Sequence, residues 1–257
     1  MNEVTIKAVD EIALMRESGK LLAKVFKMLD DFIKPGVSTL EIDSQVESYI
    51  VNELRARPAS KGQYGYQYCL NSSINEVVCH GVPSASQVLK STDIVNIDIT
   101  LEKNGFITDS SKMYVMPDAK PDARALVKVT TEAMWLGIKT VKPGAKLGDI
   151  GFAIQNYVGK FGYTVVKEYC GHGIGREMHE EPNVLHYGRP NTGLTLKEGM
   201  TFTIEPMINQ GTARVKTKKD GWTVVTKDKK LSAQAEHTIL VTKDGFEVLT
   251  LREEEQI

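Results

Sequence analysis

An internal repeat limits the possible folds of this chain more than any single motif does. The segment IKPGVSTLEI, which begins at Ile33, matches VKPGAKLGDI, which begins at Val141, and each copy precedes a predicted helix. Further along, LKSTDIVNID ends at Asp98 and LKEGMTFTIE ends at Glu205, again about 100 residues apart. Both of these later segments end in a carboxylate. The repeat predicts two similar halves that each deliver acids to a shared centre.

Two further pairs of polar residues recur in the same order. EVVCHGVP contains His80 and REMHEEP contains His179, so each copy places a histidine near a proline. Asp109 begins DSSKMYV and Glu236 begins EHTILV, which puts an acid before an apolar strand in both halves. The match between these two acids is the weaker of the two. Together the pairs predict that acids and a histidine from both halves converge.

Hydrophobic periodicity predicts the helices and strands of the two halves. It predicts helices over 10–33, from Thr39 onward, over 122–139 and over 147–161, and strands over 93–116 and 200–208. The pair Asn104-Gly105 inside the first strand segment predicts a hairpin turn. We therefore expect an α/β fold in a single domain, 1–257, with an internal repeat of approximately 10–120 and 121–250.

Charge and cysteine usage exclude several other classes of protein. Lys and Arg number 32 against 33 Asp and Glu, so the overall balance predicts no DNA binding. The three cysteines include no CxxC pair, which argues against a disulfide scaffold or a structural zinc site. The sequence contains no apolar signal core and no run of about 18 apolar residues. We therefore expect a cytoplasmic protein that does not bind a membrane.

The acids within the predicted strands need an explanation. Asp98 lies in a strand rich in Ile and Val, and Glu205 lies between Ile204 and Pro206, where an uncompensated interior charge is costly. One alternative is a strand whose acids face water. Four acids and a histidine at repeat-related positions are better explained by cations, because oxygen ligands with one imidazole suit Mn, Fe, Co or Zn. Two metal ions would also let four carboxylates converge without raising one another's pKa values.

Six motifs carry a resemblance to a known family over nearly the whole chain. They are INEVVCHGVP, DIVNIDIT, NGFITDSSKMY, GHGIGREMHEEP, GMTFTIEPM and AQAEHTILV. The sequence resembles the type I methionine aminopeptidases in their short bacterial form, without an N-terminal extension. The resemblance implies the pita-bread fold, in which two pseudo-two-fold-related α/β halves surround a dinuclear metal site. The family's ligands for two divalent ions fall on Asp98, Asp109, His172, Glu205 and Glu236.

The same resemblance implies how these ligands divide between the two ions. Asp109 and Glu236 are expected to bridge the ions, with Asp98 on one ion and His172 and Glu205 on the other. His172 is expected on a bend, where the flanking glycines let the backbone approach metal and substrate closely.

Three residues are expected to act on the substrate. Glu205 would move the proton of the attacking water, and His179 would stabilise the developing tetrahedral species. His80 would lie close to the bound amino terminus and donate or position a proton. A zincin is a poor alternative, because HExxH needs histidines four residues apart and His172 and His179 are further apart.

Alignment with the family also gives a pocket for the first side chain of the substrate. Its expected lining is Tyr66, His80, Met178, His179 and Trp222. Ser60 and Asn71 stand where relatives often have cysteine, and Met178 stands where a phenylalanine is common. The pocket wall is therefore expected to be more polar and more pliable, while methionine remains the preferred residue.

The sequence also leads to expectations about partners and about a second cation site. The expected substrate is the N-terminal methionine of nascent polypeptides, preferentially when the second residue is small, and the enzyme is expected to be a monomer. The basic segment 214–230 is either a solvated hairpin or a transient contact with the ribosome. Asn75, Val77 and Ser232 match positions where relatives bind a monovalent cation through oxygen atoms.

Three related proteins are the alternatives. Proline-specific aminopeptidases share the site but usually carry a large additional N-terminal domain. Type II methionine aminopeptidases carry a helical insertion before the last glutamate, for which the interval between Glu205 and Glu236 is too short. A non-catalytic relative that binds peptides or RNA should have lost ligands, and this sequence retains all five.

Overall fold

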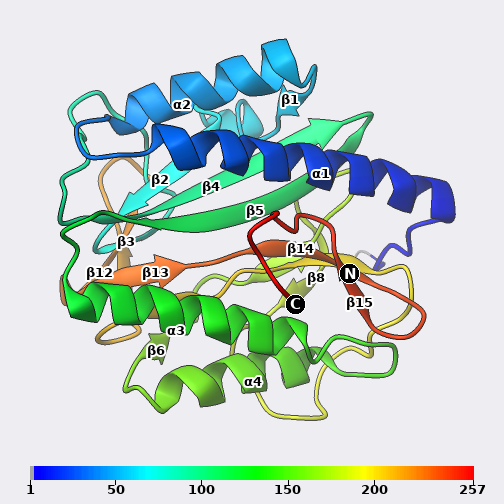
Figure 1. Cartoon of the computed structure of the whole chain (residues 1–257). Coiled ribbons are helices and arrows are strands. Elements are labelled where there is room, and N and C mark those ends of the chain that lie inside the picture. The colour runs from blue at the N-terminus through cyan, green and yellow to red at the C-terminus, as the bar shows by residue number, and fades with distance from the viewer. Residues whose placement is uncertain (1–2) are drawn as a thin grey trace.

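The computed structural model describes residues 3–257 and arranges its helices and sheets in layers (Figure 1). The helices are α1 (Val9–Phe32), α2 (Thr39–Ser48), α3 (Pro121–Ile138) and α4 (Leu147–Gly159), with short helical turns at Tyr49–Glu53 and Gln63–Gly65. The first strands are β1 (Arg57–Pro58), β2 (Leu70–Ile74), β3 (Val77–Cys79), β4 (Ile94–Lys103) and β5 (Phe106–Val115). They are followed by β6 (Thr164–Val165), β7 (Gly171–Gly173), β8 (Glu180–Val184), β9 (Thr201–Ile204) and β10 (Met207–Asn209). The last are β11 (Val215–Thr217), β12 (Val224–Thr226), β13 (Ser232–Gln234), β14 (His237–Val241) and β15 (Phe246–Val248).

The amino-terminal half places α1 and α2 on a sheet whose central strand is β4 (Figure 1). β4 pairs antiparallel with β5 on one edge and with β1 and β2 on the other. Asn104 and Gly105 connect β4 to β5 with positive φ angles of 54° and 80°, as the predicted hairpin requires. Ile97 and Ile99 are buried in the cluster that includes α1 and α2. Because side chains alternate along a strand, Asp98 points to the opposite face, toward the second half.

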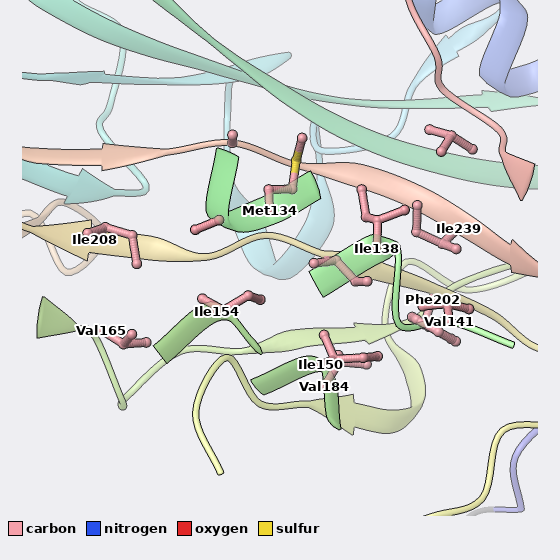
Figure 2. Close-up of a cluster of buried hydrophobic side chains, with 14 of the residues drawn as sticks. Met134, Ile138, Val141, Ile150, Ile154, Val165, Val184, Phe202, Ile208 and Ile239 are labelled. Atoms are coloured by element: carbon pink, nitrogen blue, oxygen red, sulfur yellow. The ribbon is translucent and has the colours of Figure 1, made fainter. Parts of the chain in front are cut away.

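The carboxyl-terminal half places α3 and α4 on a five-stranded sheet of order β15-β14-β9-β7-β8. Figure 2 shows the buried cluster that joins them, with Ile138 of α3, Ile154 of α4 and Phe202 of β9 among its side chains. Phe202 and Ile204 both belong to this cluster. The same alternation therefore turns Thr203 and Glu205 away from the helices.

The same local contact occurs once in each half, at positions that the repeat relates. Ser38 forms an isolated β-bridge with Val88, and Lys146 forms one with Thr195. In each copy a carboxylate three residues further on accepts a hydrogen bond of 2.8 Å from the amide of the first bridge residue. This recurrence supports the proposed repeat, while the boundaries of the two halves remain a prediction.

The structure confirms the predicted α/β class and all four long helices, and it corrects one strand. The segment 200–208 was expected to be continuous, but it consists of β9 and β10 with Glu205 and Pro206 between them. Proline has no amide proton to donate to a neighbouring strand, so the pairing breaks at this point. Among the helices of residues 3–257, none combines the length and apolar character needed to span a membrane.

Candidate active site

Residues from both halves line one cavity with a volume of about 500 Å³. One part of its wall is acidic and contains the five predicted metal ligands Asp98, Asp109, His172, Glu205 and Glu236. Another part is largely apolar and aromatic and contains Tyr66, Met178, Met207 and Trp222, while His80 and His179 also reach the cavity. Residues that are widely separated in sequence, and that the repeat analysis paired, therefore lie around a single space.

The acids and His172 converge closely. Asp109 on β5, His172 on β7 and Glu236 just before β14 each offer one ligand atom, and these atoms lie within 4.8 Å of one another. Glu205, directly after β9, places its Oε1 3.5 Å from His172 Nε2. Asp98 faces the same cavity from β4. The arrangement can surround cations with oxygen atoms and one imidazole nitrogen.

Burial makes this cluster unfavourable unless a cation is present. Burial raises the pKa of Asp98 to about 6 and that of Glu205 to about 8, and it raises those of Asp109 and Glu236 well above their usual range. Asp109 Oδ1 is also buried without a hydrogen-bond partner among residues 3–257. An unpaired buried carboxylate oxygen among other acids fits a metal ligand, since a cation would satisfy it and offset the repulsion.

The imidazole of His172 is held in the form that binds a metal. Its Nδ1 lies 3.0 Å from the carbonyl oxygen of Gly173, and because a carbonyl can only accept, Nδ1 carries the proton. The lone pair is therefore on Nε2, the atom that faces Glu205. Burial, with the nearby His179 ring, lowers the pKa of His172 to about 3, so the ring is neutral near pH 7.

His172 lies on strand β7 and not in a turn, and the expected bend takes the form of an irregularity in the pairing of β7 with β8 between His172 and Gly173. β7 pairs antiparallel with both β8 and β9. A Cβ on Gly171 would lie 2.3 Å from the carbonyl oxygen of Thr203, and one on Gly173 would lie 2.1 Å from that of Glu181. The glycines therefore allow the neighbouring strands to approach β7, and this close approach fixes the position of His172.

Residues that sequence reasoning missed hold Glu205 in place. Thr203 Oγ1 donates to Glu205 Oε1 at 2.7 Å, and Gln234 Nε2 donates to Oε2 at 3.3 Å. The amide of Glu205 donates to His186 Nε2 at 3.0 Å, which gives His186 a structural role. Thr203 could have been found from the sequence, because a residue two positions before Glu205 on a strand shares its face.

The two remaining histidines lie beside the acids. The ring of His179 lies 4.4 Å from the ring of His172, measured between centroids. His80 directly follows β3 with a φ of 54°, a conformation uncommon outside glycine, and its ring packs edge-on against Tyr169 at 5.4 Å. Such backbone strain is often found at functional positions. Both rings border the cavity without belonging to the group of closest ligand atoms.

The predicted side-chain pocket is also assembled. The rings of Tyr66 and Trp222 lie 5.0 Å apart, and the Tyr66 hydroxyl donates to the carbonyl oxygen of Leu70 at 2.9 Å. Met178 is buried in the same wall. Ser60 donates its hydroxyl to Thr100 Oγ1 at 3.0 Å, so part of its polarity is used within the protein.

The structure gives less support to two further candidate cation sites. The carbonyl of Asn75 accepts the amide of Ser232 at 2.9 Å, and Val77 lies on β3 close by, so the predicted monovalent site remains a prediction. A second cluster contains Asp43, Glu47 and Cys69. There Asp43 Oδ1 already accepts the amide of Cys69 at 2.8 Å, which indicates a structural role at the start of β2.

Metal-free protein is expected to lose stability as the pH rises from about 7 to about 8. Glu205, Asp109 and Glu236 keep protons in the folded state that the unfolded state releases near pH 4. Each such carboxyl lowers the free energy of unfolding by about 1.4 kcal/mol per pH unit while it stays protonated only in the folded state, or about 3 °C in Tm for this size. Below this interval the buried histidines oppose the trend, since burial lowers their pKa values and unfolding lets them bind protons.

Thermal unfolding of chelator-treated protein at three pH values across this interval measures the slope. The control is the same series with saturating Mn²⁺, in which cations replace protons at the acids and the slope should shrink. A metal-free Tm that stays level or rises would contradict the expected convergence of carboxylates.

Comparison with known proteins agrees with this geometry. Residues 13–243 match the sequence profile of metallopeptidase family M24. The methionine aminopeptidase of Escherichia coli (strain K12) is 51% identical over 254 residues, which cover 99% of this chain and 96% of that protein. The methionine aminopeptidase of Haemophilus influenzae is 47% identical over 253 residues, covering 98% of this chain and 94% of that protein.

Solved structures give the same fold. Methionine aminopeptidase from Rickettsia prowazekii superposes with a TM-score of 0.94 at 49% identity and covers 97% of this chain and 100% of its own. Prolidase from Pyrococcus horikoshii superposes with a TM-score of 0.76 at 24% identity, over 98% of this chain and 65% of its own. The second likeness shows the shared fold alone.

The fold and the acidic cavity define an α/β metallohydrolase of the pita-bread class. Its acids and imidazole come from two sheets and meet at the seam between two halves. The chain belongs to metallopeptidase family M24, in its branch of bacterial type I methionine aminopeptidases. Membership of a metallopeptidase family implies the use of divalent metal ions, and Asp109, His172 and Glu236 form a candidate group to hold them.

Proposed function

We propose that this protein is a dinuclear metallo-exopeptidase that removes the N-terminal methionine from nascent proteins and peptides, preferentially when the second residue is small. The observation that carries the proposal is the buried group of Asp109, His172 and Glu236 beside an apolar pocket in one cavity. The acids supply a place for metals and for a free α-amino group. The pocket formed by Tyr66 and Trp222 supplies a place for one unbranched apolar side chain.

The proposed ligands divide between two ions whose identity among Co, Mn, Fe and Zn stays open. Asp109 and Glu236 would help to hold the two ions, together with Asp98, His172 and Glu205. When bound, two divalent ions lower the pKa of water and polarise the scissile carbonyl. The protonated Nδ1 of His172 and its bond to Gly173 keep Nε2 available as a ligand.

Glu205 is the proposed general base. Thr203 and Gln234 fix its two carboxylate oxygens from the protein side, which orients the group toward the cavity. Burial raises its pKa to about 8 in the protein without metal, and a nearby cation would lower that value toward the working pH. The carboxylate can then take a proton from the attacking water and pass it to the departing amine.

His179 and His80 are proposed to act on the substrate. His179 borders the cavity next to His172, where a ring N–H can stabilise the oxyanion of the tetrahedral species. His80, held in a strained conformation beside Tyr169, would donate or position a proton near the scissile amide. The acidic end of the cavity accepts the free α-amino group, so cleavage stops after one residue.

Reloading of metal-stripped enzyme tests the proposed function and its specificity. Stripped protein is expected to be inactive, and one or more of Mn²⁺, Fe²⁺, Co²⁺ and Zn²⁺ should restore cleavage of Met-Ala-Ser. Leu-Ala-Ser is expected to react at least about 10-fold more slowly, because a changed shape of the first side chain in an apolar pocket is worth about 1–3 kcal/mol. Met-Lys-Ser is also expected to react more slowly, because the second residue should be small.

A Pro-terminated peptide series is the control for the proline-specific alternative. If the leucine or lysine peptide is cleaved as fast as Met-Ala-Ser, the specificity is wrong although the metal chemistry stands. If no metal restores any cleavage, the non-catalytic alternative holds.

The cytoplasmic location, the monomeric state and the transient ribosome contact remain proposals. The hairpin β11–β12 carries exposed basic residues, among them Lys216, Lys218 and Lys219, and Trp222 of the pocket lies between its strands. Exposed lysines are compatible with a solvated hairpin as well as with RNA. Co-sedimentation with ribosomes at low and high salt separates the two readings, because only RNA docking predicts salt-sensitive pelleting.

A further inference from the structure

A buried arginine beside the acids has no place in the proposed mechanism. Arg252 belongs to the segment that follows β15, which lies next to β5 and β14 (Figure 1). It is 5% exposed, and its guanidinium lies over the ring of Phe26 at 5.2 Å. Burial of a positive charge costs free energy. The contacts of the Arg252 guanidinium therefore indicate why an arginine occupies this position.

Arg252 reaches the backbone of one acid through a serine. Its Nη1 donates to Ser110 Oγ at 3.0 Å, and Ser110 Oγ donates to the carbonyl oxygen of Glu236 at 2.7 Å. Ser110 directly follows Asp109 on β5, and Glu236 comes from the other half. These two hydrogen bonds therefore cross the seam beside two of the proposed ligands.

The same segment also holds the residues after Glu236. Thr250 Oγ1 accepts the amide of Thr238 at 3.1 Å and lies 2.8 Å from His237 Nδ1. Glu255 accepts from Arg252 Nη2 and lies 3.1 Å from His237 Nε2. Because Glu255 balances the charge of Arg252, the pair can be buried beside His237.

Backbone pairing at this point is weak. Ser111 and Glu236 form an isolated bridge whose two backbone hydrogen bonds are long, at 3.4 and 3.3 Å. Thr238 adds a side-chain link at Asp109, donating to its carbonyl at 2.8 Å. The position of Glu236 relative to Asp109 therefore depends on side-chain hydrogen bonds. Among them, the hydroxyl of Ser110, which accepts from Arg252, donates to the carbonyl oxygen of Glu236 itself.

We propose that Arg252 is a positioning residue of the metal centre, which holds Glu236 in register with Asp109 by way of Ser110. This inference rests on the proposed dinuclear function. Neither Arg252 nor Ser110 supplies a ligand; both act on the backbone that carries one. Loss of such supporting hydrogen bonds typically weakens metal affinity about 10- to 100-fold.

The test measures Mn²⁺ binding by calorimetry for Arg252→Met and Ser110→Ala. Both variants are expected to raise the Mn²⁺ dissociation constant about 10- to 100-fold, while KM for Met-Ala-Ser at saturating Mn²⁺ changes less than about twofold. The matched control is Glu253→Gln on the same segment, because Glu253 is exposed and makes no side-chain hydrogen bond or ion pair within residues 3–257. This control should bind Mn²⁺ like the wild type.

A purely structural role gives a different result. It predicts a lower Tm for Arg252→Met with an unchanged Mn²⁺ dissociation constant, and that outcome overturns the inference. If Arg252→Met does not fold, Ser110→Ala decides alone: weaker binding supports the inference and equal binding overturns it. If the wild type itself binds no Mn²⁺, Fe²⁺, Co²⁺ or Zn²⁺, the proposed function fails instead.

Discussion

Glu205→Gln is expected to leave a folded protein whose kcat on Met-Ala-Ser is reduced roughly 100- to 10,000-fold. The amide keeps the size of the side chain, and Thr203 Oγ1 can still donate to its oxygen. It cannot accept a proton from water, and it is a weaker metal ligand than a carboxylate. The loss should therefore fall mainly on kcat, with a smaller change in KM.

The matched control for this variant is Glu198→Gln. Glu198 is an exposed glutamate in the loop before β9 and lies outside the cavity lining. Its replacement should leave kcat unchanged. Near-native turnover by Glu205→Gln would show that the proton is moved by another group and that the assignment of Glu205 is wrong.

His179→Ala is expected to retain its metal ions and to lose at least about 100-fold in kcat, as for removal of one oxyanion donor. Its ring packs edge-on against that of His172 without joining the close group of Asp109, His172 and Glu236. The metal content of the purified variant and its kcat, measured on the same sample, separate the two roles.

His172→Ala is the variant to compare with His179→Ala in that experiment. Removal of a proposed ligand should lower both metal content and activity, whereas His179→Ala should lower activity alone. Loss of a metal ion from the His179 variant would make His179 a ligand and would require the proposed division of roles to be redrawn.

Local sequence signals predicted the regular elements well. The helix α1, the hairpin turn at Asn104 and Gly105, and the alternation of Ile97, Asp98 and Ile99 all depend on neighbours within a few residues. The repeat also paired Asp98 with Glu205, which lie on β4 and directly after β9. These features could be predicted because the interactions that determine them are local or are repeated in the chain.

Contacts between distant segments were not predictable in the same way. The glycines beside His172 suggested a bend, but Gly171 and Gly173 are required by the approach of strands β8 and β9, which no local pattern reveals. Arg252 and Ser110 meet across more than one hundred residues with no motif to mark them. The candidate ligands were accessible from the sequence, while the network that positions them was not.

The distribution of the site over the whole chain determines when this enzyme can become active during its own synthesis. Asp98 and Asp109 leave the ribosome with the hairpin β4–β5, well before β14 and the segment with Arg252 are made. Strands paired over such long sequence separations form late in folding. Asp109, His172 and Glu236 can meet only after Glu236 has been made, so we expect the metal centre to form after β14 has been synthesised.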